Sequence, residues 1–305
     1  MVQGSVLGPL LFLLYINDVA DIFNSDVKIK LYADDLKLYS SVQTNDDCNN
    51  LQTNINFLCE WANVWQLTIS KSKCFMTQIG IHNGCYSYSL CNSPITTRSE
   101  ISDLGVIVDS NLNFTSHINS IVSKAHVRAN LILRSFQSKR DQSLIKAFNT
   151  YVRPLLEYCS SVWSPLFKKD IIKIESVQRR FTKRLPGYKH LTYPQRLRKL
   201  NMESLEVRRI RNDLLLAYKI VFGILNTDLN HYFKIKAATY NLKGHKYKLQ
   251  LPMCKNSRSS HFYFYRVISV WNNLPALTTD FSSLRRFKNS LTAQYILQHC
   301  VVNFC

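Results

Sequence analysis

Two adjacent aspartates are the clearest chemical signal in the chain. Asp34 and Asp35 lie between two short runs, 27–32 and 36–39, in which apolar residues alternate with basic ones. Alternation with a period of two is typical of strands and Asp favours turns, so we expect a β-hairpin with the acids at its turn. Adjacent carboxylates repel each other unless a cation lies beside them, and hard oxygen ligands suit Mg²⁺. The pair predicts either a metal site or an ordinary solvated hairpin tip.

A polar turn and an apolar run precede this hairpin. The backbone N–H groups of such a turn can contact a phosphate or a base, although an ordinary loop before a helix is the alternative. The run from Val6 to Ile16 is too short to span a bilayer, and the polar, acidic continuation argues against a signal peptide. We expect a buried helix there and no membrane association. The turn consists of Gln3, Gly4 and Ser5.

The order of these motifs resembles a known family. Gln3-Gly4-Ser5-Val6-Leu7-Gly8-Pro9-Leu10-Leu11-Phe12 followed by Tyr32-Ala33-Asp34-Asp35 closely resembles the palm of reverse transcriptases from non-LTR (LINE-type) retrotransposons. The resemblance implies an RNA-directed DNA polymerase that uses Mg²⁺, an RNA template, a DNA primer and deoxynucleoside triphosphates. It implies that Asp34 and Asp35 are catalytic and hold the metal. It also implies a nucleotide and template pocket formed by Gln3, Gly4, Ser5 and Tyr32.

Two later segments extend the resemblance. We expect a strand, a loop and a second strand over 67–76. In the family, this segment carries a lysine that acts as general acid for the departing pyrophosphate. Lys73 is the candidate for that role and Lys71 offers a second amine nearby; the alternative is that Lys73 is an ordinary surface lysine. We also expect a hairpin over 103–118 with its turn at 109–111. In the family this hairpin grips the primer terminus, which implicates Leu104 and Gly105.

From residue 44 onward, apolar residues recur at steps of three and four, which predicts helices. The first helix runs to about residue 65, with Thr44 or Asn45 as its cap. Later stripes cover 118–136, 144–152 and 171–181, and segments within 153–184 resemble the thumb of jockey-like and CR1-like elements. The aromatic residues of 258–275 either stack on bases or form a small core. We expect a nucleic-acid backbone to be contacted by Arg128, Arg134, Lys139, Arg140, Arg179 and Arg180.

Charge is distributed unevenly along the chain. The formal net charge is +19; residues 1–120 hold 6 Lys/Arg and 11 Asp/Glu, a balance of −5, and the remainder holds 33 and 9, a balance of +24. Such a basic region indicates nucleic acid or an anionic membrane surface as partner, and phosphate contacts would make binding strongly salt-dependent. The nine cysteines form no Cys-x-x-Cys pair, which favours reduced thiols in an intracellular compartment. A zinc site from Cys74, His82, Cys85 and Cys91 is an alternative, but its spacing matches no usual ligand scheme.

We therefore expect an α/β fold: a partial polymerase palm with hairpins over 1–117, a mainly α-helical thumb over 118–200 and a basic C-terminal region over 201–305. In the family, another catalytic aspartate and the fingers lie upstream of the Gln-Gly motif. For that reason we expect this chain alone to be inactive as a polymerase, and the alternative function is a relic that only binds nucleic acid. A fragment that does not fold alone is a further possibility. The resemblance implies a nuclear location, without a clear targeting signal.

Overall fold

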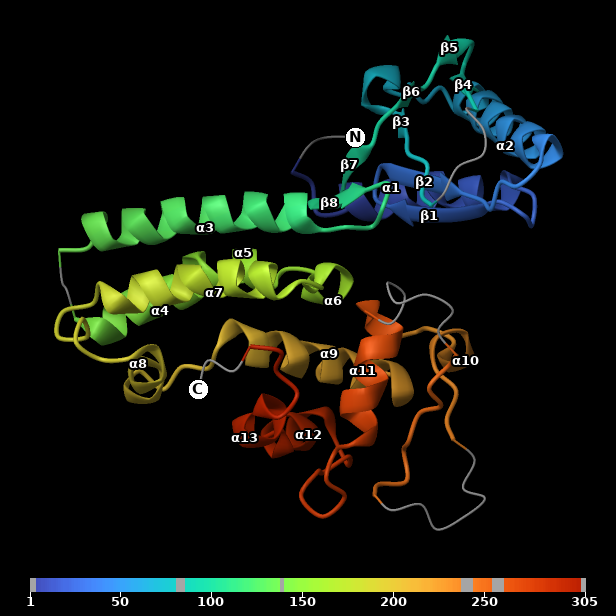
Figure 1. The fold of residues 1–305 in the computed structure, drawn as a ribbon. Helices are drawn as coiled ribbons and strands as arrows, with labels where there is room; N and C mark the ends of the chain where they lie inside the picture. The colour runs from blue at the N-terminus through green and yellow to red at the C-terminus, as the bar shows by residue number, and fades with distance from the viewer. Residues whose placement is uncertain (1–3, 81–85, 138–139, 237–243, 254–260, 303–305) are drawn as a thin grey trace. The chain divides into compact units, whose positions relative to one another are not determined.

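The computed structural model describes residues 4–80, 86–137, 140–236, 244–253 and 261–302, coloured along the chain in Figure 1. The chain forms two compact units. The first contains Met1–Ser102 and Val108–Leu112, and the second contains Asp103–Ile107 and Asn113–Cys305. The three-part division at residues 117 and 200 stays a prediction. About half of the chain is helical and its sheets are small, as expected for a mixed α/β protein with a helical second part.

The predicted hairpin around the acid pair is present in the first unit. Strands β1 (Lys28–Tyr32) and β2 (Asp35–Tyr39) are antiparallel, and Tyr32 pairs with Asp35, which leaves a turn of two residues. Side chains along both strands alternate between exposed and half-buried. The period-two pattern of the sequence is therefore the pattern of a sheet with one covered face.

Helix α2 (Asn45–Val64) is the main helix of the first unit. Thr44 caps it: the Thr44 side chain accepts from the Asp47 N–H, and the Asp47 carboxylate accepts from the Thr44 N–H at 2.8 Å. This reciprocal capping box satisfies two backbone donors at the helix start and confirms the predicted boundary. Ile55 and Cys59 of α2 pack against Tyr88 and Leu90 to form the small core of this unit.

Helix α1 (Gly8–Ile16) forms where it was expected, but the prediction that it is buried is wrong. Only Ile16 is buried, and Leu14 is 67% exposed. The contacts that anchor α1 lie in its last turn, where the Tyr15 hydroxyl donates to the Trp65 carbonyl at 2.5 Å. A sequence that is apolar on every side of a helix predicts that the whole helix is buried. In the structure, the described residues cover only one end of α1. The helix is followed by the 3-10 segment η1 (Asn17–Ile22).

Short strands complete the sheet content. Strand β3 (Phe75–Met76) pairs in parallel with β6 (Thr96–Thr97), and β4 (Ser89–Leu90) pairs with β5 (Ser93–Pro94). The expected strand over 67–70 is absent from this described stretch, and a 3-10 turn, η2 (Lys71–Lys73), precedes β3. Only the second half of the predicted strand–loop–strand is therefore confirmed.

The second hairpin lies earlier in the sequence than predicted. Its strands are β7 (Glu100–Asp103) and β8 (Val106–Asp109), with Leu104 and Gly105 at the turn. Both turn residues have positive φ, 45° and 83°, as a type I′ hairpin turn requires. The expected turn at 109–111 forms: the Leu112 N–H donates to the Asp109 carbonyl at 3.0 Å, and the Asn111 N–H donates to the Asp109 carboxylate at 3.0 Å. The expected return strand is replaced by the start of a helix at Thr115.

The second unit is built from helices. Its core contains the predicted apolar stripes, in which Leu144 and Ile174 are fully buried and the rings of Phe148 and Phe181 lie 4.6 Å apart. Leu156 and Trp163, outside those stripes, are also fully buried. The chain breaks between α4 and α5 next to Pro154, as the sequence predicts. The helices are α3 (Thr115–Ser135), α4 (Asp141–Tyr151), α5 (Arg153–Glu157), α6 (Ser160–Trp163), α7 (Lys168–Lys183), α8 (Tyr193–Lys199) and α9 (Leu205–Val221).

Of the last four helices, the final three pack against α9, as Figure 1 shows. Trp271 and Phe287 are fully buried in this core and Phe264 is packed against it. For Trp271 and Phe264 the core role is confirmed over base stacking, whereas Phe262 is exposed. No helix in the described part of the chain is long and apolar enough to cross a bilayer. These helices are α10 (Leu229–Tyr232), α11 (Tyr263–Asn272), α12 (Leu284–Ser290) and α13 (Ala293–Leu297).

Candidate active site and nucleic-acid interface

The acid pair lies at the tip of the β1–β2 hairpin. Asp34 is the second turn residue, Asp35 begins β2, and both are exposed. Ala33, the first turn residue, has φ 51°, a left-handed conformation that costs an L-residue roughly 1 kcal/mol. Such strain is typical of positions whose conformation serves a site. The tight turn places two consecutive carboxylate residues at the surface.

Both carboxylates are uncommitted within the described part of the chain. Neither forms a hydrogen bond or an ion pair with another residue that the structure describes. Two free hard-oxygen donors of this kind fit part of a divalent cation site. Among the same residues no group of three or more His, Cys, Asp or Glu gathers in a way that could hold a metal. The zinc alternative includes His82 and Cys85, which lie outside the described residues.

The residues predicted to shape the nucleotide pocket differ in their surroundings. Tyr32 precedes the turn and is 68% exposed. Gly4 has φ 89°, and the Ser5 hydroxyl accepts from the Gly8 N–H at 2.9 Å, so Ser5 satisfies the start of α1. Gln3 lies outside the described residues. Their predicted role in binding nucleotide and template stays a prediction.

The structure distinguishes the two candidate lysines. Lys71 Nζ donates to the Cys91 carbonyl and to the Ser93 hydroxyl, each at 3.0 Å, and thereby holds the β4–β5 turn. Lys73 is exposed, and its amine has no partner among the described residues. Of the two amines, Lys73 is the one free to meet a ligand. No hydrogen bond in the described part of the chain joins Lys73 to the acid pair.

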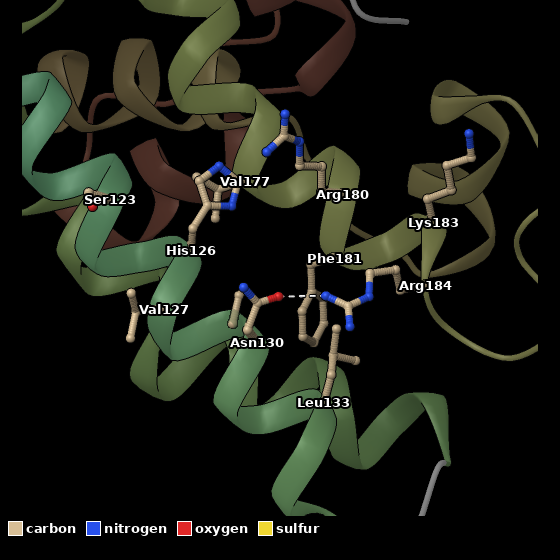
Figure 2. Close-up of a pocket in the computed structure, with 11 residues that line it drawn as sticks. Ser123, His126, Val127, Asn130, Leu133, Val177, Arg180, Phe181, Lys183 and Arg184 are labelled. Atoms are coloured by element: carbon tan, nitrogen blue, oxygen red, sulfur yellow. Dashed lines mark hydrogen bonds between the residues drawn. The ribbon is translucent and has the colours of Figure 1, made fainter.

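A groove of about 490 Å³ lies between α3 and α7 in the second unit (Figure 2). The two helices run parallel, because their hydrogen-bonded pairs keep a nearly constant separation in sequence: Thr115 with Asp170, Asn119 with Lys173, and Asn130 with Arg184. Arg184 reaches across to Asn130, donating at 2.5 Å, as Figure 2 shows. The groove therefore has a polar seam and a cationic rim.

The rim is formed by exposed cations of the last turns of α7. Arg180, Lys183 and Arg184 line the groove, with His126 on the opposite wall. Burial, and secondarily Arg180, lower the pKa of His126, so its ring is neutral at neutral pH. Lys183 and Arg184 were not among the predicted site residues. The signal for them was available, since they lie three and four residues after Arg180 and hence on the same helix face.

The other predicted cations are placed as follows. Arg128 and Arg134 are exposed on α3, and Arg128 Nη1 donates to the Tyr151 carbonyl at 3.2 Å. Arg179 is exposed, 5.7 Å from the centre of the Tyr193 ring, and Arg140 is exposed just before α4. Lys139 lies outside the described residues. The predicted hairpin residues Leu104 and Gly105 belong to the same unit as these cations.

Not every basic residue is available to a ligand. Arg209 of α9 is buried, close to the carboxylates of Glu175, Glu206 and Asp213. Asp213 is also paired with Arg266 at 2.9 Å. Burial raises the pKa of Asp213, and Arg266 counters the shift. This cluster is a structural feature of the helical core, because its charges face one another rather than solvent.

Comparisons with known proteins show which proteins the chain is similar to. Residues 1–108 match the family described as reverse transcriptase (RNA-dependent DNA polymerase), a segment that contains the acid hairpin and Lys73. The chain is 28% identical over 200 residues to the RNA-directed DNA polymerase from mobile element jockey of Drosophila funebris, covering 61% of this chain and 21% of that protein. It is 26% identical over 197 residues to the probable RNA-directed DNA polymerase from transposon X-element of Drosophila melanogaster, with 61% and 21% covered. An uncharacterized protein of Caenorhabditis elegans is 29% identical over 132 residues, 42% of this chain and 67% of that protein.

These matches confirm the resemblance on which the prediction rests. The chain is similar to RNA-directed DNA polymerases of the mobile elements jockey and X-element, and its first 108 residues carry the reverse transcriptase match. It spans about a fifth of the length of the curated polymerases it matches, 21% in each case. No solved structure shows a significant match.

Proposed function

We propose that this chain takes part in RNA-templated DNA synthesis as the part of a non-LTR reverse transcriptase that holds metal at Asp34 and Asp35. One observation carries the proposal: two adjacent, exposed and uncommitted carboxylates lie on a tight hairpin turn within the segment that matches reverse transcriptases. The substrates are an RNA template, a DNA primer and deoxynucleoside triphosphates.

The division of chemical work is taken from the resemblance to reverse transcriptases, and the exposure of these side chains is compatible with it. Asp34 and Asp35 supply oxygen ligands for Mg²⁺, which when bound contributes positive charge toward the attacking and leaving oxygens of a phosphoryl transfer. Lys73, the free amine of its loop, donates a proton toward the departing pyrophosphate. Tyr32, exposed beside the turn, contacts the incoming nucleotide.

The groove between α3 and α7 is the proposed seat of the template–primer backbone. Arg180, Lys183 and Arg184 offer three cations along one helix face, whereas the predicted contacts Arg128 and Arg134 are exposed on α3 outside the lining of the groove. Arg side chains suit phosphate because their planar guanidinium groups can donate two parallel hydrogen bonds. Phosphate contacts of this kind fix position without reading sequence, as a polymerase requires.

Primer extension on an RNA template tests the proposal. The assay uses a full-length polymerase that contains this segment, and compares the unsubstituted protein with Asp34→Asn, which removes one charge from the turn and preserves side-chain size. Asp26→Asn is the matched control, because Asp26 is an exposed acid just before β1, at the opposite end of the same hairpin. We expect extension by the unsubstituted full-length protein and by its Asp26→Asn variant, and loss of extension in Asp34→Asn. Extension that survives in Asp34→Asn refutes the assignment.

Nucleic-acid binding without polymerisation is the second candidate function. It is favoured by the absence, among the described residues, of a third ligand near the two aspartates, together with the cationic groove in the other unit. A wild-type chain that binds an RNA–DNA duplex but extends no primer supports this function and refutes polymerisation by the chain itself.

A further inference from the structure

The turn of the second hairpin is fastened to the helical unit at two points. The Tyr158 hydroxyl, between α5 and α6, donates to the Leu104 carbonyl at 3.0 Å. Three residues along the chain, the Ile107 N–H donates to Nδ1 of His117 on α3 at 3.3 Å. One bond holds the turn itself and the other holds strand β8 directly after it, so both the position and the orientation of the turn are fixed.

A single buried tryptophan supports both fastening residues. Trp163 is fully buried; its Nε1–H donates to the Tyr158 carbonyl at 2.6 Å, and its ring centre lies 5.2 Å from that of His117. Cys159, directly after Tyr158, has φ 52°, so the chain reverses sharply at this point and brings Tyr158 and Trp163 together. The side chains of Tyr158 and His117 are therefore set by one packing unit, although they are far apart in the sequence.

The turn itself depends on outside support. Leu104 holds a left-handed φ of 45° that a branched side chain adopts only at a cost, and such conformations persist where the surroundings enforce them. A Cβ added at Gly105 would lie 3.7 Å from Cε1 of Tyr158, so the ring lies against the glycine backbone. Leu104 is 44% exposed and Tyr158 is 56% exposed, so the supported turn faces solvent and is accessible to a ligand.

We infer that Tyr158 and His117, fixed by Trp163, are positioning residues that hold the Leu104–Gly105 turn in place for the 3′ end of a primer. This inference rests on the proposed function, and it adds residues that the hairpin motif alone does not indicate. The ligand is a duplex with a recessed 3′ end, as opposed to a blunt duplex or a single strand. Because neither fastening bond involves the groove between α3 and α7, general binding of nucleic acid does not depend on this anchor.

The test uses the full chain with Tyr158→Phe, which removes only the hydroxyl. Tyr151→Phe is the matched control, since Tyr151 is 57% exposed and its hydroxyl has no partner among the described residues. In Tyr158→Phe we expect hydrogen exchange in the segment 103–109 to become about fivefold faster, which corresponds to about 1 kcal/mol for one hydrogen bond. We expect the ratio of recessed-end to blunt-duplex affinity to fall by a similar factor while single-strand affinity is unchanged.

Substitutions of His117 provide a second, independent check. His117→Asn keeps an acceptor oxygen close to the position of Nδ1, whereas His117→Leu removes it; we expect the Asn variant to retain the recessed-end preference and the Leu variant to lose it. If hydrogen exchange in the segment 103–109 is unchanged in Tyr158→Phe, the proposed anchoring of the turn is wrong. If the wild-type chain does not prefer a recessed 3′ end over a blunt duplex, the role assigned to the turn is wrong. A wild type that binds no nucleic acid refutes the proposed function instead, and the exchange data still decide whether the anchor exists.

Discussion

Removing two cations from the groove between α3 and α7 should change the salt dependence of nucleic-acid binding by a calculable amount. The groove is lined by three exposed cations that face no carboxylate partner in the described structure: Arg180, Lys183 and Arg184. If all three contact phosphates of a duplex, log affinity falls with log salt at a slope of about −2.7, or about 40-fold between 50 and 200 mM. In Arg180→Gln/Arg184→Gln the slope becomes about −0.9, or about 3.5-fold over the same range.

The assay is a binding titration of an RNA–DNA duplex at several salt concentrations. Lys168→Gln/Lys169→Gln is the matched control, because it removes the same charge from the first turn of α7, about 18 Å along the helix from Arg180. Thermal unfolding checks that loss of the bond between Arg184 and Asn130 has not unfolded the unit. Equal slopes in the wild type and the groove variant, or an equal change in the control, would refute the assignment of the groove.

Three further predictions concern the fold that positions these sites. Phe181→Ala empties a fully buried position beside Phe148 and should lower the unfolding free energy of the helical unit by about 3–5 kcal/mol, measured by denaturant titration; a loss below 1 kcal/mol contradicts the packing. Ala33→Gly should stabilise the acid hairpin by up to about 1 kcal/mol, because glycine adopts a φ of 51° without strain, and faster amide exchange in the hairpin would contradict this expectation. Burial, and secondarily the bond to Asp141, raise the pKa of Tyr188 to about 12, so its stabilising contribution is present below pH 10 and is lost as the pH rises through 12. An absorbance titration in which all tyrosines ionise near pH 10 would exclude that shift.

The local elements of the protein could be predicted from its sequence because their signals are local. Alternating residues before and after Asp34 predicted the hairpin, and Thr44 with Asp47 three residues later carried the signature of a helix start. The stripe that includes Ile174 and Phe181 likewise faces the core as its spacing indicates. In each case the residues that determine the structure lie within one or two turns of each other.

Features that depend on distant contacts were not predictable in the same way. The exposure of α1 depends on what covers a uniformly apolar helix, and its own sequence does not encode that. The second hairpin turns at Leu104-Gly105, which lacks the usual Asn-Gly signal, and contacts with Tyr158 and Gly105's freedom at positive φ support the turn. The choice between Lys71 and Lys73 depends on the carbonyl and hydroxyl that Lys71 meets twenty residues later.

Metal-directed cleavage of the chain tests the central claim, metal binding at Asp34 and Asp35, most directly. Fe²⁺ in place of Mg²⁺, with ascorbate and peroxide, generates radicals that cut the backbone beside the bound ion, and the fragments are located by mass spectrometry. The proposed site predicts cuts within residues 32–36 that are suppressed by excess Mg²⁺, absent in Asp34→Asn and retained in Asp26→Asn. Cuts that fall elsewhere, or that persist unchanged in Asp34→Asn, would contradict the assignment of the acid pair as metal ligands.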